Sequence, residues 1–385
     1  MRVLHVYRRY FPDAPGGTAE AIRQIALVLQ PRNVESRVFA LSPASDTQPV
    51  ERPEGRVVRS RSWGAPASCD IGGVNAFSRF GHQVKWADLV HYHFPWPFAD
   101  LLHLAIRPEK PALMTYHSDV VEKGVLGKCY QPIQSRMLNA MDAVVATSPA
   151  YRESSPTLRG LEASRPGRVH VIPLGISESS YRDYLDAAAT MSVADAFGLT
   201  PGRYFLFIGA ARAYKGLSVL GEAAMDSTLP VAVAGPGTGR DEQLDRGAGP
   251  SHLKHLGQVS PAGKMALIEQ CRALVLPSNR RSEAFGMVLV EAAMCGKPLI
   301  STELGTGTSY VNIHGETGLV VPPDDAGSLR HAMEMLASDD EAVGRMGVAS
   351  RRRYEKHFAG RPLAEAYERL YERILADARD RNVHG

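Results

Sequence analysis

The stretch Ser282–Ala293 reads Ser-Glu-Ala-Phe-Gly-Met-Val-Leu-Val-Glu-Ala-Ala and carries two glutamates eight residues apart. The pattern predicts that Glu283 lies on a loop and that Gly286 opens a helix, which carries Glu291 about two turns on. The first N–H groups of such a helix are free to bind an anion. The two carboxylates would hold hydroxyls on either side of these amides, so a sugar, a diphosphate and a ribose would fit in that order.

Short apolar runs and helical segments alternate on both sides of this stretch. In the first half, strands are expected at Val3–Tyr7, Arg37–Leu41, Arg56–Ser60, Asp88–His93, Ala112–His117, Ala143–Ser148 and Val169–Pro173. In the second half, they are expected at Tyr204–Ile208, Val231–Ala234, Leu253–Gly257, Ala273–Pro277, Pro298–Thr302 and Gly318–Val321. Apolar strands joined by helical crossovers form parallel sheets that are covered on both faces. The pattern therefore predicts an α/β protein with two Rossmann-like domains.

The alternation breaks near Pro173–Ile176 and restarts at Thr200–Gly202, after a polar helical connector. We therefore expect a first domain over residues 1–178 and a second domain over 179–360. A length of 385 residues suits two domains. The last segment, Ala364–Arg379, has an apolar stripe typical of a packed helix, made of Ala366, Leu370, Ile374 and Leu375.

Composition and charge restrict the setting in which this chain works. An apolar fraction of 44% and a charged fraction of 22% are those of a soluble globular protein. No run has the length of a secretory signal or a membrane span, and the four cysteines have no metal-ligand spacing, so a cytoplasmic location is expected. Residues 1–180 carry 21 Lys and Arg against 16 Asp and Glu, whereas residues 181–385 carry 23 against 25. The basic first half is either a solvated face or a contact with an anionic membrane or a diphosphate-linked lipid.

Candidate ligand-binding residues of the first domain follow its expected strands. Gly16 and Gly17 stand between a strand and a helix, where glycine lets the backbone approach an anion closely. His91 and His93 end one strand, and His117 and Asp119 follow another, at the sheet edge where parallel sheets bind ligands. The His-x-His spacing also admits a metal site, although no carboxylate or thiol joins it at a recognisable spacing. We expect His91 and His93 to be structural, and His5 to lie in the core.

The second domain begins with a basic pair. Arg212 and Lys215 lie three residues apart, beside glycines, after the expected strand Tyr204–Ile208. Arg offers a planar fork and Lys a compact charge, and both suit a pyrophosphate. Negative charge grows on a leaving diphosphate as its bond to a sugar breaks, and fixed cations there lower the barrier. A solvated basic turn is the alternative.

Together, the spaced glutamates, the Gly-Gly loop, His117 and the basic pair resemble the motifs of the retaining glycosyltransferases of GT-B fold, the large family often called GT4. Further similar segments are Ala234–Gly237, Leu256–Ser260 and Gly315–Pro322, so the resemblance covers about 330 residues. One position departs from the family pattern. Ala210 stands where the family has an arginine directly after the glycine, and Arg212 follows two residues later.

The resemblance implies two domains facing across a cleft, with a C-terminal helix, about 361–385, that crosses back to the first domain. It implies metal-independent transfer of a hexose with retention of configuration. Of the residues in this sequence, His117 would contact the transferred sugar and Asp119 would orient an acceptor hydroxyl. Gly16 and Gly17 would lie against the donor diphosphate, Arg212 and Lys215 would stabilise it as it leaves, and Glu283 and Glu291 would hold sugar and ribose hydroxyls. Backbone amides of the helix start would face the donor, contributed by Phe285, Gly286, Met287 and Val288.

The spaced basic pair and the segment Ser301–Asn312 look like those of bacterial O-antigen mannosyl- and D-rhamnosyltransferases. That resemblance implies a GDP-linked mannose or rhamnose as donor and an undecaprenyl-diphosphate-linked saccharide as acceptor. No metal or cofactor is expected. The stretch Phe77–Trp86 would then either rest on the inner membrane surface as a peripheral contact or form an internal packing helix.

Two other functions remain open. The first is a nucleotide-sugar 2-epimerase of the same fold, which needs no acceptor. The second is a non-catalytic sugar-nucleotide sensor, which the displaced Arg212 keeps possible. The paired glutamates argue against the epimerase, and the presence of Lys215 and Glu283 argues against the sensor.

Overall fold

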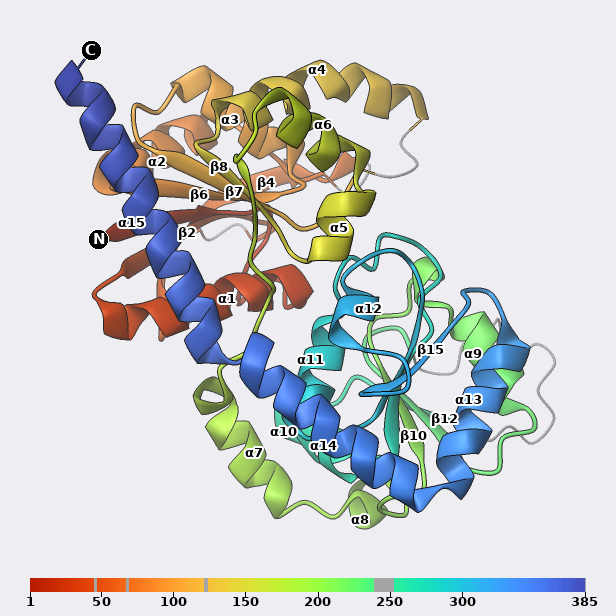
Figure 1. Cartoon of the computed structure of the whole chain (residues 1–385). Coiled ribbons are helices and arrows are strands. Elements are labelled where there is room, and N and C mark those ends of the chain that lie inside the picture. The colour runs from red at the N-terminus through yellow and green to blue at the C-terminus, as the bar shows by residue number, and fades with distance from the viewer. Residues whose placement is uncertain (45–46, 67–68, 121–123, 239–252, 385) are drawn as a thin grey trace. The chain divides into compact units, whose positions relative to one another are not determined.

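The computed structural model describes residues 1–44, 47–66, 69–120, 124–238 and 253–384, and it divides the chain into two compact units (Figure 1). Unit 1 consists of Met1–Gly175 together with Gly360–Gly385, and unit 2 of Ile176–Ala359. The divisions fall close to the boundaries at 178 and 360 that the sequence predicts. Each unit is a Rossmann-like α/β body with a parallel sheet, which confirms the predicted fold class.

The sheet of unit 1 has the strand order β3-β4-β2-β1-β6-β7-β8-β9, with β5 paired to β4. Its strands are β1 (Arg2–Val6), β2 (Glu35–Ser42), β3 (Val50–Arg52), β4 (Gly55–Gly64), β5 (Ile71–Gly72), β6 (Leu89–Phe94), β7 (Ala112–Tyr116), β8 (Ala143–Ala146) and β9 (Val169–Val171). Neighbours from β4 to β9 along this order run parallel, whereas β3 and β5 add to β4 in antiparallel sense. The sequence does not reveal β3 and β5, because strands of two or three residues show no periodicity.

The sheet of unit 2 has the order β12-β11-β10-β13-β14-β15, and its neighbouring strands run parallel. Its strands are β10 (Phe205–Ile208), β11 (Val231–Ala234), β12 (Leu253–Gly257), β13 (Ala273–Leu276), β14 (Leu299–Thr302) and β15 (Gly318–Val321). The strands β10, β11, β13 and β14 consist almost wholly of buried residues. Such apolar runs are what the interior of a parallel sheet requires, since helices cover both faces.

Several helices begin where a polar side chain or a proline favours a helix start. In unit 1 they are α1 (Gly17–Leu29), α2 (Val74–Trp86), α3 (Pro97–Ile106), α4 (Gly124–Ala140), α5 (Pro149–Ser154), α6 (Pro156–Ser164) and α15 (Gly360–His384). In unit 2 they are α7 (Arg182–Ala189), α8 (Val193–Phe197), α9 (Leu217–Ala224), α10 (Pro261–Gln270), α11 (Met287–Met294), α12 (Thr308–Val311), α13 (Ala326–Ser338) and α14 (Asp340–His357). Several begin with a side chain that accepts a backbone N–H, and these caps are Ser148, Ser155, Ser192, Ser260, Asp325 and Asp339.

The helix α15 packs beside α1 and completes the core of unit 1, as the resemblance implied for the C-terminal segment. The predicted stripe needs a correction. The buried side of α15 is centred on Tyr367 and Tyr371, with Leu363, Leu370 and Ile374 beside them, whereas Ala366 and Leu375 lie at its partly buried margin. The predicted stripe contains only aliphatic residues, so it leaves out the two tyrosines. For this reason it is displaced from the face of α15 that is buried.

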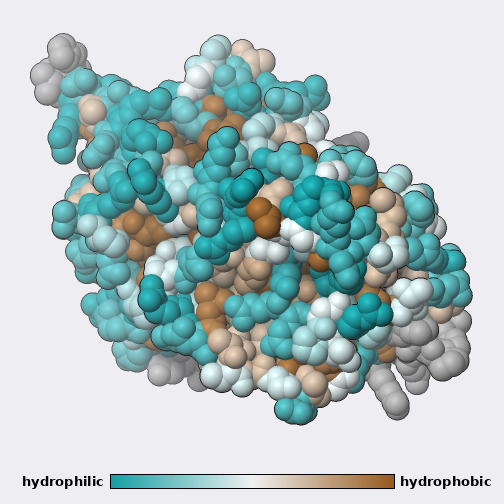
Figure 2. Space-filling model, turned by 60° about the horizontal axis from the view of Figure 1, so that its bottom comes forward, coloured by the Kyte–Doolittle hydropathy of each residue, from teal (hydrophilic) through white to brown (hydrophobic). Residues whose placement is uncertain are grey.

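Within the described ranges, no helix is both long and apolar enough to cross a membrane. Hydrophilic residues predominate on the face that Figure 2 shows, and hydrophobic residues are scattered among them. The stretch Phe77–Trp86 lies within α2: Phe80 is buried, Phe77 packs on Phe98, and the Trp86 ring lies 4.0 Å below the Arg37 guanidinium. These contacts favour the packing-helix reading of that stretch.

Candidate functional site

The loops that leave β10, β13 and β14 lie at the carboxyl edge of the sheet in unit 2, because these strands are parallel neighbours. Lys215 comes from the first loop and Glu283 from the second, and their side chains form an ion pair. Both are largely buried, with 13% and 10% of their side-chain surface exposed. Ser278 Oγ donates a second hydrogen bond to Glu283 Oε2 over 3.0 Å. The structure therefore joins two residues that the sequence analysis assigned to different parts of one ligand.

The electrostatics of this pair keep the lysine charged. Burial is the largest single influence and lowers the pKa of Lys215, but attraction to the Glu283 carboxylate, the hydrogen bond to it and the nearby Tyr214 together outweigh burial, so that the pKa is raised overall. The loop geometry brings the two side chains together. Gly216 has φ +67°, and a Cβ there would lie 1.9 Å from the Pro277 carbonyl oxygen. Only glycine allows the loop that carries Lys215 to pass so close to the loop that carries Glu283.

Arg212 stands apart from this pair. Its backbone is extended, and it caps the short 3-10 helix Ala213–Lys215. The side chain is exposed and has no partner among the residues that the structure describes. Arg212 is therefore a free cation close in sequence to the paired Lys215, and it is available to an anionic ligand.

The helix α11 begins at Met287 with Gly286 as its N-cap, as predicted. No side chain caps this end, so the first amide groups remain open to an anion. Phe285, just before it, is 3% exposed and packs its ring against Phe358 at 6.0 Å between centroids. Thr306 Oγ1 donates to the Glu283 carbonyl over 2.8 Å, which ties the loop after β14 to the same edge.

Glu291 is the fifth residue of α11 and is buried, with two donors that the sequence analysis missed. Tyr181 Oη lies 2.7 Å and Lys264 Nζ 2.6 Å from Glu291 Oε1. The second oxygen, Oε2, has no hydrogen-bond partner within the described ranges and is free to accept from a ligand hydroxyl. No local pattern marks Tyr181, which is 110 residues away. Lys264 lies in α10, which begins directly after the segment Leu256–Ser260.

In unit 1, Gly16 and Gly17 lie at the start of α1 and are exposed. The helix end has no side-chain cap, and a Cβ at Gly16 would meet nothing within 4 Å. The protein's own packing therefore does not require glycine at position 16. Space and an uncapped helix start at this position leave room for a ligand to approach the backbone, and the diphosphate contact of Gly16 and Gly17 stays a prediction.

His117 and Asp119 follow β7 directly, at the carboxyl edge of this sheet. His117 is 6% exposed, its backbone N–H donates to the Phe94 carbonyl, and burial lowers its pKa to about 3. The ring is therefore neutral at physiological pH. The Asp119 carboxylate accepts hydrogen bonds from three hydroxyls of its own unit, which belong to Tyr116, Tyr151 and Ser155. These bonds anchor the loop, so Asp119 has a structural task beside its predicted contact with an acceptor.

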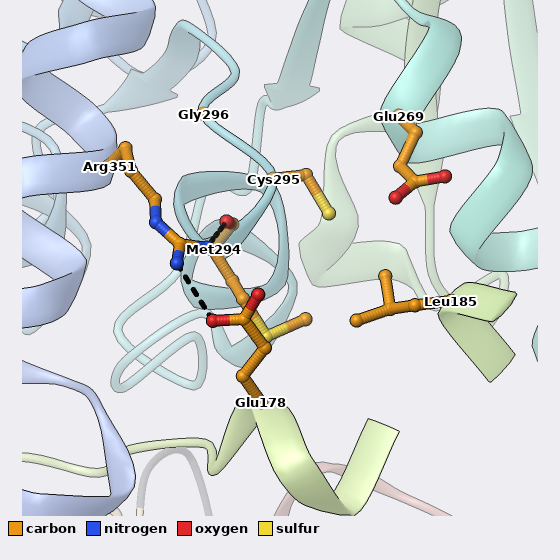
Figure 3. Close-up of a pocket in the computed structure, with 7 residues that line it drawn as sticks. All are labelled: Glu178, Leu185, Glu269, Met294, Cys295, Gly296 and Arg351. Carbon is orange, nitrogen blue, oxygen red and sulfur yellow. Dashed lines mark hydrogen bonds and ion pairs between the residues drawn. The ribbon is translucent and has the colours of Figure 1, made fainter. Parts of the chain in front are cut away.

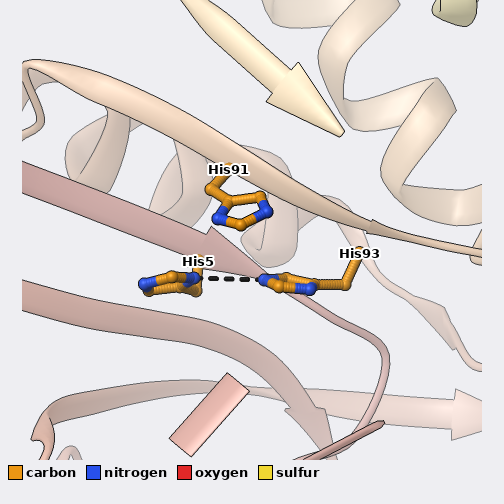
Figure 4. A group of neighbouring side chains, drawn as sticks. All are labelled: His5, His91 and His93. Carbon is orange, nitrogen blue, oxygen red and sulfur yellow. Dashed lines mark hydrogen bonds between the residues drawn. The ribbon is translucent and has the colours of Figure 1, made fainter. Parts of the chain in front are cut away.

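The histidines His5, His91 and His93 gather on one face of the sheet (Figure 4), with potential ligand atoms within 4.8 Å of one another. Their hydrogen bonds argue against a metal site. Both nitrogens of His91 contact hydroxyls, of Tyr371 at 2.8 Å and of Thr115 at 2.7 Å. His5 Nδ1 and His93 Nε2 lie 3.1 Å apart and share a hydrogen bond. The trio therefore does not offer three free lone pairs, and these contacts favour the structural role of His91 and His93, which stays a prediction.

A cavity of about 250 Å³ lies elsewhere in unit 2 (Figure 3). Cys295 and Gly296 in its wall precede the amino end of β14, and Glu178 pairs with Arg351 across it at 2.8 Å. The remaining lining residues are Leu185, Glu269 and Met294. Ligands of parallel sheets bind at the carboxyl ends of strands, so this cavity is not where we place the donor.

Comparison with known proteins shows which families this chain resembles over its two regions. Residues 15–180 match the family described as Glycosyltransferase Family 4, and residues 196–353 match Glycosyl transferases group 1. The chain is 39% identical to the O-antigen chain mannosyltransferase C of Escherichia coli over 97% of this chain and 99% of that protein. It is 38% identical to the D-rhamnosyltransferase WbpZ of Pseudomonas aeruginosa over 93% of this chain and 92% of that protein.

Solved structures share the fold at lower identity. The sucrose-phosphate synthase of Thermosynechococcus elongatus has a TM-score of 0.75 and 20% identity, over 98% of this chain and 99% of that one. The Anabaena protein HepE, solved in complex with UDP and glucose, has a TM-score of 0.73 and 15% identity, over 97% of this chain and 99% of that one.

Proposed function

The chain belongs to the glycosyltransferases in which a Family 4 region is followed by a group 1 region, and from this premise we propose that it transfers mannose or D-rhamnose during O-antigen synthesis. Two relatives with these activities are 39% and 38% identical to it over more than nine tenths of its length. The observation that carries the proposal in the structure is the buried pair of Lys215 and Glu283 at the carboxyl edge of unit 2, beside the uncapped start of α11.

Unit 2 supplies the groups that suit a nucleoside diphosphate sugar. In this proposal, Arg212, Lys215 and the first amides of α11 stabilise the negative charge that develops on the leaving diphosphate. Glu283 accepts from sugar hydroxyls while it holds Lys215, and Glu291 Oε2 accepts from the ribose. These fixed charges replace a bound metal ion, so we propose that transfer is metal-independent.

Configuration at the transferred carbon is retained in the proposed reaction. The acceptor oxygen attacks the face from which the diphosphate departs, and the departing phosphate oxygen takes the acceptor proton. His117 contacts the transferred sugar as a neutral imidazole, because burial suppresses its charged form. The acceptor is a saccharide linked to an undecaprenyl diphosphate, and the basic first half of the chain would favour that anionic lipid.

Thermal unfolding with a panel of donors tests the proposal. A ligand that binds only the native state at about 100 times its Kd stabilises that state by about 2.7 kcal/mol. We expect GDP-mannose or GDP-D-rhamnose to raise the melting temperature, and UDP-glucose and ADP-glucose to leave it unchanged. A rise with UDP-sugars alone would contradict the proposed donor.

Product analysis tests the chemistry. Transfer should persist in EDTA, and NMR of the product should show the anomeric configuration of the donor. A strict requirement for Mg²⁺, or an inverted product, would contradict the proposed mechanism. Donor incubated without acceptor serves as the control, because an altered sugar there would identify a 2-epimerase instead.

A further inference from the structure

Three imidazoles of unit 1 form a hydrogen-bonded string that ends at His117. His117 Nε2 lies 3.0 Å from His93 Nδ1, and His93 Nε2 lies 3.1 Å from His5 Nδ1. Figure 4 shows the second of these contacts. The three residues come from the end of β7, from β6 and from β1, which are neighbours in the sheet. The string thus links the candidate sugar-contacting residue to the interior of the unit.

The histidines and Thr115 form the polar end of a face whose amino-terminal part is apolar. On the same face, the strand residues nearer the amino ends are Val3, Leu89 and Leu113, which belong to the core under α15. Residues separated by an even number of positions on a strand share a face, so the rows continue toward the carboxyl edge with His5 after Val3, with His91 and His93 after Leu89, and with His117 after Leu113. His91 stacks on His93 with 4.2 Å between ring centroids, but its hydrogen bonds go to Tyr371 and Thr115, outside the string.

Burial keeps all three rings of the string uncharged. His5, His93 and His117 are at most 6% exposed, and desolvation lowers the pKa of each well below the ordinary value. A neutral imidazole carries one N–H, so each contact in the string must contain one proton between two nitrogens. Only two arrangements satisfy this condition: all three rings protonated at Nδ1, or all three protonated at Nε2.

The free end of the string decides between the two arrangements. His5 Nε2 is buried and has no hydrogen-bond partner within the described chain. In the Nε2 arrangement this atom would be a buried donor without an acceptor, whereas in the Nδ1 arrangement it is only a vacant lone pair. Buried N–H groups without a partner are rarer in proteins than acceptors whose capacity is unfilled. The Nδ1 arrangement is therefore favoured along the whole string.

We propose that His5 and His93 are positioning residues that hold His117 as its Nδ1–H tautomer, so that His117 donates a hydrogen bond to a hydroxyl oxygen of the transferred sugar. This inference rests on the proposed function for the identity of the ligand. His117 Nδ1 has no hydrogen-bond partner within the residues that the structure describes, so its N–H is available. The reverse arrangement would make the same atom an acceptor and would leave a sugar hydroxyl as the donor.

The tautomers can be measured without any substrate. In protein labelled with ¹⁵N-histidine, long-range ¹H–¹⁵N spectra distinguish a protonated ring nitrogen from a bare one, and single His→Gln variants assign the signals. We expect His5, His93 and His117 to be protonated at Nδ1 and bare at Nε2. Protonation of His117 at Nε2 would overturn the proposal, and so would stoichiometric zinc bound at His5 and His93. Because donor binding plays no part in this measurement, its outcome is separate from that of the proposed function.

Variants of His5 test whether the string acts on turnover. His5→Leu removes the terminal donor, so His117 should become a mixture of tautomers and kcat should fall about tenfold, with the donor KM changed less than about twofold. His5→Asn keeps an N–H near the Nδ1 position and should restore both the tautomer and kcat. His91→Gln is the matched control, because His91 stacks on the string without joining it, and it should change neither. An unchanged His117 tautomer and kcat in folded His5→Leu would overturn the proposal.

Discussion

The ion pair of Lys215 and Glu283 joins residues that lie 68 positions apart in the chain. Removal of either partner leaves a largely buried charge without compensation. Glu283→Gln or Lys215→Met should therefore destabilise unit 2 by roughly 2 to 3 kcal/mol, somewhat less than the cost for a fully buried pair. Each change should also reduce transfer more than about 100-fold, because the diphosphate loses a fixed charge or the sugar loses its acceptor.

Urea denaturation of the two single variants and the double variant measures this coupling. The double variant should lose less stability than the sum of the two single losses, since it leaves no unpaired charge. Strict additivity would show that the two side chains do not interact.

Arg212 allows a cleaner test of charge, because it is exposed and unpaired within the described chain. Arg212→Ala should lower kcat about 100-fold and change the free energy of unfolding by less than about 0.5 kcal/mol. Arg203 is the matched control: it is also exposed, but it precedes β10, whereas Arg212 follows the carboxyl end of that strand. Equal losses of activity in Arg203→Ala and Arg212→Ala would remove the assigned role.

At the scale of elements, the start of α11 depends on Gly286. This residue has φ +81°, and an added Cβ would lie 2.9 Å from Leu289 Cδ1 and 3.0 Å from Leu276 Cδ2. Gly286→Ala should therefore cost about 1 to 2 kcal/mol for the left-handed backbone and about 1 kcal/mol or more for the crowding. The displaced helix start should also weaken donor binding, which calorimetry would measure.

Gly315→Ala separates the cost of the left-handed backbone from the cost of side-chain crowding. Gly315 has φ +77° in the same unit, but a Cβ there meets nothing within 4 Å. This variant should lose only the backbone part of the stability and should keep donor affinity. If the two variants were equally stable and bound donor equally well, the packing argument for Gly286 would be wrong.

At the scale of the whole molecule, unit 1 is assembled from both ends of the chain. The core under α15 includes Leu363, Tyr367, Leu370, Tyr371 and Ile374. Burial of each such side chain contributes about 1.5 to 3 kcal/mol, and the sum is comparable with the whole stability of a domain, about 5 to 15 kcal/mol. We therefore expect residues 1–175 alone to lack a cooperative unfolding transition, whereas residues 176–359, a contiguous unit, should unfold cooperatively. Circular dichroism of the two fragments checks this, and a stable 1–175 fragment would contradict it.

The buried histidines make unit 1 sensitive to acid. The folded pKa of His5 and of His117 is lowered from 6.5 to about 3, so the unfolded chain binds more protons between these values. Stability is therefore fully present above pH 6.5 and is lost as pH falls toward 3, by about 1.4 kcal/mol per pH unit for each such histidine. His91 and His93, whose pKa values are also lowered by burial, add to this loss.

Tryptophan fluorescence reports this loss selectively, because all three tryptophans, Trp63, Trp86 and Trp96, belong to unit 1. The urea midpoint followed by fluorescence should fall steeply between pH 6.5 and pH 5. The variant His91→Gln should show a shallower fall. A midpoint independent of pH in this range would contradict the burial of neutral histidines.

The sequence by itself determined the two parallel sheets and the loops where ligands bind. The strands β11, β12 and β15 have the predicted bounds. For β11 and β15 the reason is local, because a short apolar run between turns is a sufficient signal for a buried strand. Gly286 at the start of α11 was likewise predictable, since helix starts are local. The buried aromatic residues of α15 and the short strands β3 and β5 were not predicted, because a local pattern of aliphatic residues does not contain their signal.

Only the tertiary structure decided which side chains meet. The pairing of Lys215 with Glu283, the two donors on Glu291 and the string from His117 to His5 each depend on strand order and register across the sheet. Strand order and register depend on many contacts between residues that are distant in the sequence, so no short window of sequence determines them. Periodicity sets which face a residue occupies, but the neighbour on that face comes from another strand, and it is this neighbour that determines charge, tautomer and partner.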